Sequence, residues 1–365
     1  MVRTIVIAGG GTGGHVFPGL AMADEMRRRD PTLEIVFVGT ERGLEARVVP
    51  DRGYRLELVR VAPLKGMSLA RAALSVAILS REMAGAAAFV ARTRPALVLC
   101  LGGYAGGPVS FVAGAARTPL FLFEPNAVVG FTNRMLARFA RRAYVAWPDM
   151  EAGFPRGVGA ALGVPVRAVF AEARQSGDYV TREYRPAPQL LIMGGSQGAR
   201  HLNETLPRAV AHARTLGATF RVVHQCGKGN AEDVRARYAA LDVEVTVSDF
   251  IDDVAGAIEL SDVIVARAGA VSLAEICAIG RATILVPLPT AADDHQTKNA
   301  DILATRGAAH AVPQASATPE TLGAQLHVLC TDFALRQTMA AASRVLGKPD
   351  AAARIVDDIL KMSGL

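Results

Sequence analysis

Residues 8–19, AGGGTGGHVFPG, follow the apolar run TIVI and decide the fold. A glycine-rich turn between a buried strand and a helix is typical of doubly wound α/β domains. Gly9, Gly11 and Gly14 match the pattern G-x-G-x-x-G, in which the backbone can approach a ligand and helix N–H groups can face an anion. The same turn also forms with nothing bound, so the motif predicts the fold and leaves the ligand open.

The pattern recurs half a chain later, in QLLIMGGSQGARHLN at 189–203. Short apolar runs separated by helix-length segments indicate parallel strands covered by helices on both faces. At 365 residues the chain exceeds the ~100–200 residues of one domain. We therefore predict an α/β protein with two doubly wound, Rossmann-like domains that face a cleft. The predicted strands are TIVIA, EIVFV, YRLELVRV, ALVLCL, PLFLF and AYVAW, then QLLIM, FRVVHQC, VEVTV, DVIVA, ATILVP and AAHAV.

A segment rich in proline and glycine, between Trp147 and Arg167, interrupts this alternation. We place the domain junction there. The first domain is expected to span 1–163 and the second 164–347. The last helical stretch, 348–365, is expected to pack back on the first domain.

Composition narrows the class of ligand. The formal charge of +6 and the pI of about 9.4 suit an acidic small molecule or an anionic membrane surface better than nucleic acid. Aromatic residues make up only 5%, which argues against stacking of single-stranded bases. The four cysteines form no C-x-x-C pair, so no zinc site is predicted. No signal peptide and no run of ~18 apolar residues is recognised.

His15 directly follows the first glycine turn. A dinucleotide site needs an acid about 20 residues past the glycines, and Glu41 comes too late. A P-loop is excluded because no Gly-Lys-Ser/Thr follows. The field of a helix N-terminus would favour the neutral imidazole that a general base requires, while packing or capping is an equally good interpretation of His15.

Ten ordered motifs across nearly the whole chain resemble the MurG family of glycosyltransferases. This family transfers N-acetylglucosamine from UDP-N-acetylglucosamine to lipid I, giving lipid II for bacterial peptidoglycan. The resemblance implies a GT-B fold, no required cofactor, and a peripheral enzyme at the cytoplasmic face of the cell membrane. Its implied partners are both substrates, an anionic membrane surface and cell-wall synthesis proteins. The motifs are GGGTGGHVFPGLA, GTERGLE, GGYAGGP, FEPN, PVR, GGSQGAR, FIDDV, RAGAVSLAEI, VPLPTAADDHQTKNA and PDAAARIV.

The resemblance assigns donor-binding residues mainly to the second domain. Ser196 and Arg167 would bind the diphosphate, and Ile251 would meet the uracil. Glu275 would accept both ribose hydroxyls, although it could also lie on a solvated helix face. Gln296 would read the sugar hydroxyls. The backbone expected to line the nucleotide pocket is that of Ala270, Val271, Ser272, Leu273 and Ala274.

The acceptor residues fall in the first domain. His15 is the candidate base for the acceptor 4-hydroxyl, with Glu124 as its orienting partner or as an alternative base. One displacement would invert the α-linked donor to a β-glycoside. Residues expected near the lipid-linked diphosphate and the acceptor are Thr12, Gly13, Gly14, Tyr104 and Asn126.

No Asp-x-Asp motif indicates a metal-bridged diphosphate, so no metal site is predicted, and assistance by a divalent ion is left open. The acidic pairs at 252–253 and 293–294 are interpreted as cap and loop residues. Two positions depart from the family pattern. Pro125 stands for the usual glutamine and removes an N–H donor, and Val164 stands for an asparagine.

Residues 64–83 are consistent with a patch that binds the surface of an anionic membrane; their sequence is LKGMSLARAALSVAILSREM. Leu74 and Ile78 lie four apart, with Lys65, Arg71 and Arg81 nearby. An ordinary core-facing helix is an equally good interpretation.

Other functions remain open at this point. A GT-B transferase that glycosylates diacylglycerol and a UDP-N-acetylglucosamine 2-epimerase share the two-domain, UDP-binding pattern. A nicotinamide dehydrogenase and a non-catalytic UDP-sugar sensor are weaker alternatives, since His15 and Glu124 would have no task in a sensor.

Overall fold

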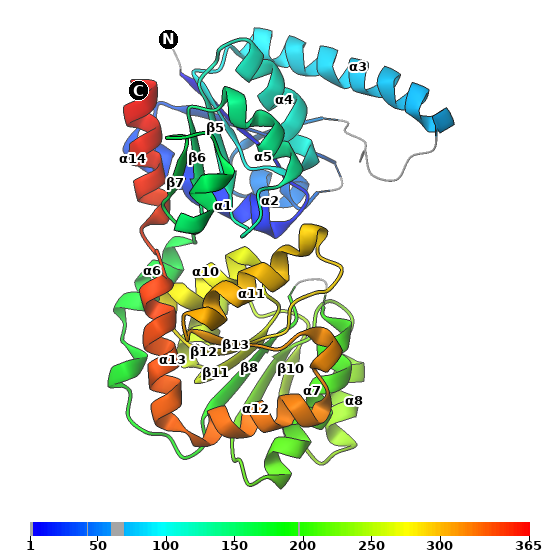
Figure 1. The fold of residues 1–365 in the computed structure, drawn as a ribbon, viewed down its shortest axis with the longest axis vertical. Helices are drawn as coiled ribbons and strands as arrows, with labels where there is room; N and C mark the ends of the chain where they lie inside the picture. The colour runs from blue at the N-terminus through cyan, green and yellow to red at the C-terminus, as the bar shows by residue number, and fades with distance from the viewer. Residues whose placement is uncertain (1–2, 42, 60–68, 196–197) are drawn as a thin grey trace. The chain divides into compact units, whose positions relative to one another are not determined.

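The computed structural model of the chain describes residues 3–41, 43–59, 69–195 and 198–365, with the backbone alone for 69–80. Two compact units divide the chain, one of Met1–Arg167 with Asp350–Leu365 and one of Ala168–Pro349. Each unit is built on one sheet whose paired strands all run parallel, with helices between consecutive strands (Figure 1). The predicted α/β class with two doubly wound domains is confirmed.

The sheet of the first unit has the strand order β3-β2-β1-β4-β5-β6-β7. Strand β1 pairs with β2 on one side and β4 on the other, so the order reverses at β1, where the glycine turn begins. The elements of this unit are β1 (Thr4–Ala8), α1 (Gly13–Arg29), β2 (Glu34–Gly39), α2 (Glu45–Asp51), β3 (Arg55–Leu58), α3 (Leu69–Thr93), β4 (Leu97–Cys100), α4 (Gly103–Ala115), β5 (Leu120–Glu124), α5 (Phe131–Leu136), η1 (Ala137–Phe139), β6 (Arg142–Val145), η2 (Pro148–Gly153), β7 (Gly159–Ala161) and α14 (Ala351–Ser363).

Strand β7 lies within the segment that the sequence indicated only as a junction. Gly159 pairs with Ala143 of β6, which makes β7 the edge of the sheet. Glycine and alanine have low strand propensity, so this strand could not be predicted from the residues alone. The small residue is required because a Cβ on Gly159 would lie 2.8 Å from the Glu151 Cα atom. Segment 148–161 therefore belongs to the first unit.

The C-terminal helix α14 belongs to the first unit although it follows the second unit in the chain (Figure 1). Asp358 anchors it, because its Oδ2 atom accepts a hydrogen bond from the Tyr144 hydroxyl at 2.9 Å and pairs with Arg142 Nε at 3.1 Å. Apolar burial supplies the rest of the contact. The buried residues of the helix are Ala351, Ile355, Val356 and Ile359.

The second unit has the strand order β10-β9-β8-β11-β12-β13, and its order reverses at β8. The second glycine turn follows β8, so both glycine turns leave the strand at which their sheet reverses. The elements of this unit are α6 (Ala168–Gln175), η3 (Tyr179–Thr181), β8 (Gln189–Met193), α7 (Arg200–Thr215), β9 (Arg221–Gln225), α8 (Ala231–Ala239), β10 (Thr246–Ser248), α9 (Val254–Leu260), β11 (Val263–Ala266), α10 (Ala270–Ile279), β12 (Ala282–Leu285), η4 (Ala292–Asp294), α11 (His295–Thr305), β13 (Ala309–Ala311), η5 (Gln314–Ser316), α12 (Pro319–Thr331) and α13 (Phe333–Leu346).

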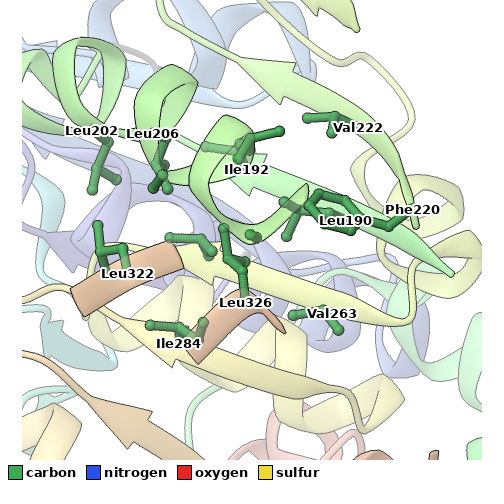
Figure 2. Close-up of a cluster of buried hydrophobic side chains, with 14 of the residues drawn as sticks. Leu190, Ile192, Leu202, Leu206, Phe220, Val222, Val263, Ile284, Leu322 and Leu326 are labelled. Carbon is green, nitrogen blue, oxygen red and sulfur yellow. The ribbon is translucent and has the colours of Figure 1, made fainter. Parts of the chain in front are cut away.

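A hydrophobic core lies between this sheet and the helices α7 and α12 (Figure 2). Each helix turns a leucine pair four residues apart toward the sheet, Leu202 with Leu206 and Leu322 with Leu326. The sheet side chains that they meet are Leu190, Ile192, Val263 and Ile284. This packing fixes the strand ends from which the site residues of the unit extend.

His224 of β9 is fully buried in a hydrogen-bonded chain. Its Nδ1 lies 3.0 Å from the Tyr238 hydroxyl and its Nε2 lies 3.1 Å from Asn203 Oδ1. Asn203 Nδ2 in turn donates to the Cys226 carbonyl at 2.9 Å. Neutral imidazole satisfies this arrangement, with Nδ1 accepting and Nε2–H donating. Burial lowers the pKa of His224 to about 3.

This depressed pKa predicts acid destabilisation of the second unit. Between pH 6.5 and 3 the unfolded histidine binds a proton that the folded one does not, so stability falls as pH falls. The loss approaches ~1.4 kcal/mol per pH unit inside that window, and the contribution is fully present above it. Urea unfolding of wild type and His224→Gln at pH 7.5, 6 and 5 should show a shallower pH slope for the variant. Equal slopes would contradict the assignment.

Candidate functional site

The first glycine turn joins β1 to α1 in a conformation that requires glycine. Gly9 has φ +145° and Gly11 has φ +92°, a region that residues with a Cβ rarely adopt. Thr12 is the N-cap of α1, and Gly13 and Gly14 form its first turn. The first N–H groups of a helix lack a carbonyl four residues back, so those of Gly13 and Gly14 can receive an anion, whereas the His15 N–H donates to the Thr12 carbonyl at 3.1 Å.

His15 lies half-buried in the same first turn of α1. Its Nδ1 is 3.4 Å from Thr12 Oγ1. Its ring also lies beside the turn before α4, since a Cβ on Gly102 would be 3.5 Å from His15 Nε2. Gly102 and Gly103 both have positive φ, at +85° and +71°. Two glycine turns from neighbouring strands, β1 and β4, therefore meet at this imidazole.

Glu124 ends β5 and is 4% exposed. Its Oε2 accepts from the Gly130 N–H at 2.8 Å and from Asn133 Nδ2 at 3.1 Å. Its Oε1 accepts from the backbone and side-chain nitrogens of Asn126, at 3.2 and 3.3 Å. Burial raises the pKa of Glu124, while these donors act in the opposite direction. The carboxylate thus holds the 126–133 segment in place through both of its oxygens.

Asn133 is a site residue that sequence reasoning missed. It is 1% exposed, and its Nδ2 also donates to the Phe123 carbonyl at 2.9 Å. The same Nδ2 lies 3.3 Å from where a Cβ on Gly102 would stand. Asn133 therefore lies between Glu124 and the turn that contacts His15. Its only sequence signal was one amide in the short stretch FTNRML, which is too weak to identify it.

Tyr104 and Asn126 lie at the ends of β4 and β5, neighbouring strands of the first sheet. Tyr104 is 47% exposed in the first turn of α4 and is available to a ligand. Asn126 is tied to Glu124 by the two bonds given above. The N–H that reaches Glu124 Oε1 comes from Asn126, so Pro125, which has no N–H, does not interrupt this contact.

Arg167 lies in the first unit, at its boundary with the second. Its guanidinium carbon is 5.6 Å from the centre of the Phe17 ring, a cation–π geometry. Phe17 in turn contacts the glycine turn, because a Cβ on Gly13 would lie 3.1 Å from its ring. The predicted phosphate ligand is thus beside the first glycine turn. Val164 is buried and makes an apolar contribution where an asparagine was expected.

The second glycine turn borders a pocket of about 580 Å³. Gly195 and Gly198 have φ +76° and +74°, and α7 begins two residues after Gly198. The pocket lies at the carboxyl ends of β8 and β11, the place where ligands bind in doubly wound sheets. Lining residues include Gly194, Gly195, Arg200, His201, Arg267 and Leu288. Ser196, the predicted diphosphate ligand, lies outside the described residues.

Arg267 is a second residue that sequence reasoning missed, although it opens the quoted motif RAGAVSLAEI. Its Nη1 donates to the carbonyls of Val286 and Pro287, at 2.9 and 3.2 Å, and its Nη2 donates to Gln314 Oε1 at 2.8 Å. Burial lowers its pKa, but an arginine keeps its charge at neutral pH. Arg267 therefore brings positive charge to the pocket and fixes the loop after β12.

Glu275 lies on α10, which begins after the N-cap Gly269. Its side chain is 7% exposed, so the alternative of a solvated helix face is wrong. The preceding residues of the helix are apolar or small, and Leu273 is buried while its neighbours are half-buried. These neighbours are the predicted pocket-lining residues Ala270, Val271, Ser272 and Ala274.

Gln296 lies in the first turn of α11, where its Oε1 accepts from the Leu288 N–H at 3.0 Å. This bond joins the helix to the loop that Arg267 holds. Ile251 is half-buried in the loop before α9. Asp253 caps α9 by accepting from the Gly256 N–H at 2.8 Å, which confirms its interpretation as a cap. Among the described residues, no cluster of His, Cys, Asp and Glu could hold a metal ion.

The structure describes only the backbone for most of the predicted interfacial stretch, and residues 64–68 lie outside the described ranges. Lys65 is outside the described residues, and of Arg71, Leu74 and Ile78 only the backbone in α3 is described. Arg81 is exposed on the same helix. Within the described ranges, no helix is both long enough and apolar enough to span a membrane.

Comparisons with known protein families cover both units. The glycosyltransferase family 28 N-terminal domain matches residues 5–145, and the C-terminal domain of the same family matches residues 189–355.

Two relatives that match over nearly the whole chain carry the same name. A UDP-N-acetylglucosamine–N-acetylmuramyl-(pentapeptide) pyrophosphoryl-undecaprenol N-acetylglucosamine transferase from Sorangium cellulosum is 45% identical, over 99% of this chain and 88% of its own. The transferase of this name from Syntrophus aciditrophicus is 38% identical over 99% of both chains.

One solved structure agrees with these relatives, and a second shares the fold. The crystal structure of Acinetobacter baumannii MurG matches with a TM-score of 0.83 and 31% identity, over 99% of this chain and 100% of that one. A putative UDP-N-acetylglucosamine 2-epimerase from Listeria monocytogenes has a TM-score of 0.68 at 14% identity, over 99% and 96% of the two chains. At that identity the likeness shows the fold alone.

Proposed function

Because this chain belongs to glycosyltransferase family 28, we propose that it is the N-acetylglucosaminyltransferase that converts lipid I to lipid II in peptidoglycan synthesis. The observation that carries the proposal is the 45% identity to a transferase of that name over 99% of the chain. The donor is UDP-N-acetylglucosamine, and the acceptor is the 4-hydroxyl of the N-acetylmuramyl residue. No observation favours the diacylglycerol, epimerase, dehydrogenase or sensor alternatives.

The second unit is proposed to bind the donor. Glu275 receives the ribose hydroxyls from its buried position on α10, and Ile251 meets the uracil. The N-terminus of α7 and Arg267 provide positive charge for the diphosphate at the pocket beside Gly195. Gln296 reads the sugar hydroxyls, and its bond to Leu288 holds its amide in one orientation.

The first unit is proposed to bind the acceptor and supply the base. Thr12, Gly13 and Gly14 approach the lipid-linked diphosphate at the N-terminus of α1, while Tyr104 and Asn126 line the acceptor side. His15 stands in the same turn, at the point where the acceptor hydroxyl would be delivered. Glu124 binds Asn133 and the rest of the 126–133 segment. In this way it positions the turn at Gly102 that His15 contacts.

The proposed step is one inverting displacement. A neutral nitrogen of His15 takes the proton of the 4-hydroxyl as its oxygen forms a bond to the anomeric carbon. The bond from that carbon to the UDP oxygen breaks, and UDP leaves with the electron pair. Arg167 and the helix N-termini stabilise the charge that develops on the leaving group. The α-linked donor therefore gives a β-linked product.

Docking to the membrane is part of the proposal, because lipid I is held in the bilayer. The cationic residues Lys65, Arg71 and Arg81 are proposed to attract the anionic cytoplasmic leaflet, at about 1 kcal/mol for each side chain near the surface. We expect the triple change of these residues to Glu to abolish sedimentation with anionic vesicles. Transfer to a short-chain, water-soluble acceptor should be retained. Sedimentation equal to wild type would contradict the docking proposal.

The proposed function is tested by the acceptor dependence of UDP release. Purified chain with UDP-N-acetylglucosamine should release UDP when a short-chain lipid I analogue is added. Neither diacylglycerol nor omission of the acceptor should support release. Turnover with diacylglycerol but not with the lipid I analogue would overturn the assignment.

A further inference from the structure

Glu45, the first residue of α2, has no role in the reaction described above, yet it is 1% exposed directly beneath the first glycine turn. Its Oε1 accepts from the backbone N–H of Thr40 at 2.8 Å and from the Thr40 hydroxyl at 3.0 Å. Its Oε2 accepts from the Gly11 N–H at 2.7 Å. A buried carboxylate is costly unless such donors satisfy it.

Three glycines make room for this carboxylate. A Cβ on Gly10, Gly39 or Gly43 would in each case approach the Glu45 side chain to under 3.0 Å, closer than real Cβ contacts. Gly10 belongs to the turn after β1, Gly39 ends β2, and Gly43 precedes α2. None of Gly10, Gly39 and Gly43 has φ in the left-handed region, so space and not backbone conformation requires glycine at these positions. Three segments of the chain, each with a glycine at the point of contact, therefore pack against the Glu45 side chain.

The Glu45 contact determines which N–H groups of the turn can meet a ligand. Gly11 directs its N–H to Glu45 and the His15 N–H donates to the Thr12 carbonyl, so the anion-binding donors are the N–H groups between them, those of Thr12, Gly13 and Gly14. Gly11, at φ +92°, immediately precedes Thr12, the N-cap of the helix that carries His15. A change in the orientation of the Gly11 peptide would therefore shift both Thr12 and His15.

We infer that Glu45 is a positioning residue for the acceptor site: it fixes the glycine turn so that His15 and the first-turn N–H groups of α1 face the lipid-linked acceptor. This inference rests on the proposed function and adds a residue to it. The main effect is expected on the acceptor, because apart from Arg167 the donor-binding residues are assigned to the second unit.

Glu45→Gln is the sharpest test, because it keeps the shape and replaces one accepting oxygen by an NH₂ group. That group must face either Gly11 or Thr40, both of which donate, so one buried donor is left unpaired. We expect kcat/KM for the lipid I analogue to fall about 10-fold or more, with KM for UDP-N-acetylglucosamine unchanged. Glu41→Gln, at an exposed position of the same loop, is the matched control and should behave as wild type.

A second variant and a direct readout complete the test. Gly43→Ala would displace the Glu45 carboxylate without altering its chemistry. It should likewise lower kcat/KM for the lipid I analogue and leave KM for UDP-N-acetylglucosamine unchanged. Amide hydrogen exchange at Gly11, followed by NMR, should accelerate in both variants whether or not transfer is seen. Unchanged Gly11 exchange would overturn the inference. A rise in KM for UDP-N-acetylglucosamine as large as the loss of kcat/KM for the lipid I analogue would also overturn it. Absence of transfer by wild type would instead overturn the proposed function.

Discussion

His15→Ala is expected to lower kcat for transfer of N-acetylglucosamine to a lipid I analogue by at least ~100-fold, the lower end of what a positioned general base contributes. The imidazole lies where the turns after β1 and β4 meet, and its removal leaves the acceptor hydroxyl without a proton acceptor. Initial rates at saturating donor and acceptor measure this directly. Binding of UDP-N-acetylglucosamine, followed by calorimetry, should be unchanged.

Two companion variants separate His15 from its neighbours. Thr12→Val removes the hydroxyl 3.4 Å from His15 Nδ1 and should cost far less than loss of the ring, because that contact is long. Glu124→Gln should lower the melting temperature, since both carboxylate oxygens accept N–H donors and one would then face an amide NH₂. Full activity of His15→Ala, together with loss of kcat in a stably folded Glu124→Gln, would move the base to Glu124.

Glu275→Ala is expected to raise KM for UDP-N-acetylglucosamine by about 10- to 100-fold. A hydrogen bond to a charged group contributes ~1.5–3 kcal/mol, and each 1.4 kcal/mol is tenfold in affinity. Glu275 is buried on α10, so the ribose would lose a partner that the helix presents. Donor titrations at saturating acceptor give the KM.

A modified donor makes this test specific for the ribose. The 2′-deoxy analogue of the donor should bind wild type more weakly than UDP-N-acetylglucosamine does, while Glu275→Ala should discriminate little between them. Glu244→Gln, at an exposed position of the same unit, serves as the control. If Glu275→Ala still preferred the natural donor as strongly as wild type, the ribose would have another partner.

The strands and glycine turns were predictable because their signals are local. Both glycine turns stand directly after apolar runs, and an apolar run of that length followed by glycine has few other interpretations. Strand β7 was not predictable, since its residues GAA are small to fit against Glu151 and show no strand propensity. Here a tertiary contact decided the local structure.

The site was predictable only where a motif named its residues. Glu45, Asn133 and Arg267 each bind main-chain groups as well as a side chain, and their contacts with the main chain leave no trace in the side-chain pattern. Glu45 stands in the quoted motif GTERGLE, but its contact with Gly11 spans two strands and could not be read from spacing. The burial of Glu275 likewise depends on how α10 packs on its unit.

Identification of the product that the wild-type chain forms tests the central claim most directly. We would incubate the chain with UDP-N-acetylglucosamine labelled in the sugar and a short-chain lipid I analogue, then determine the linkage by NMR. The account predicts one β-linked N-acetylglucosamine on the 4-hydroxyl of the muramyl residue, with one UDP released for each sugar transferred. Label in UDP-N-acetylmannosamine, or an α-linked product, would contradict it.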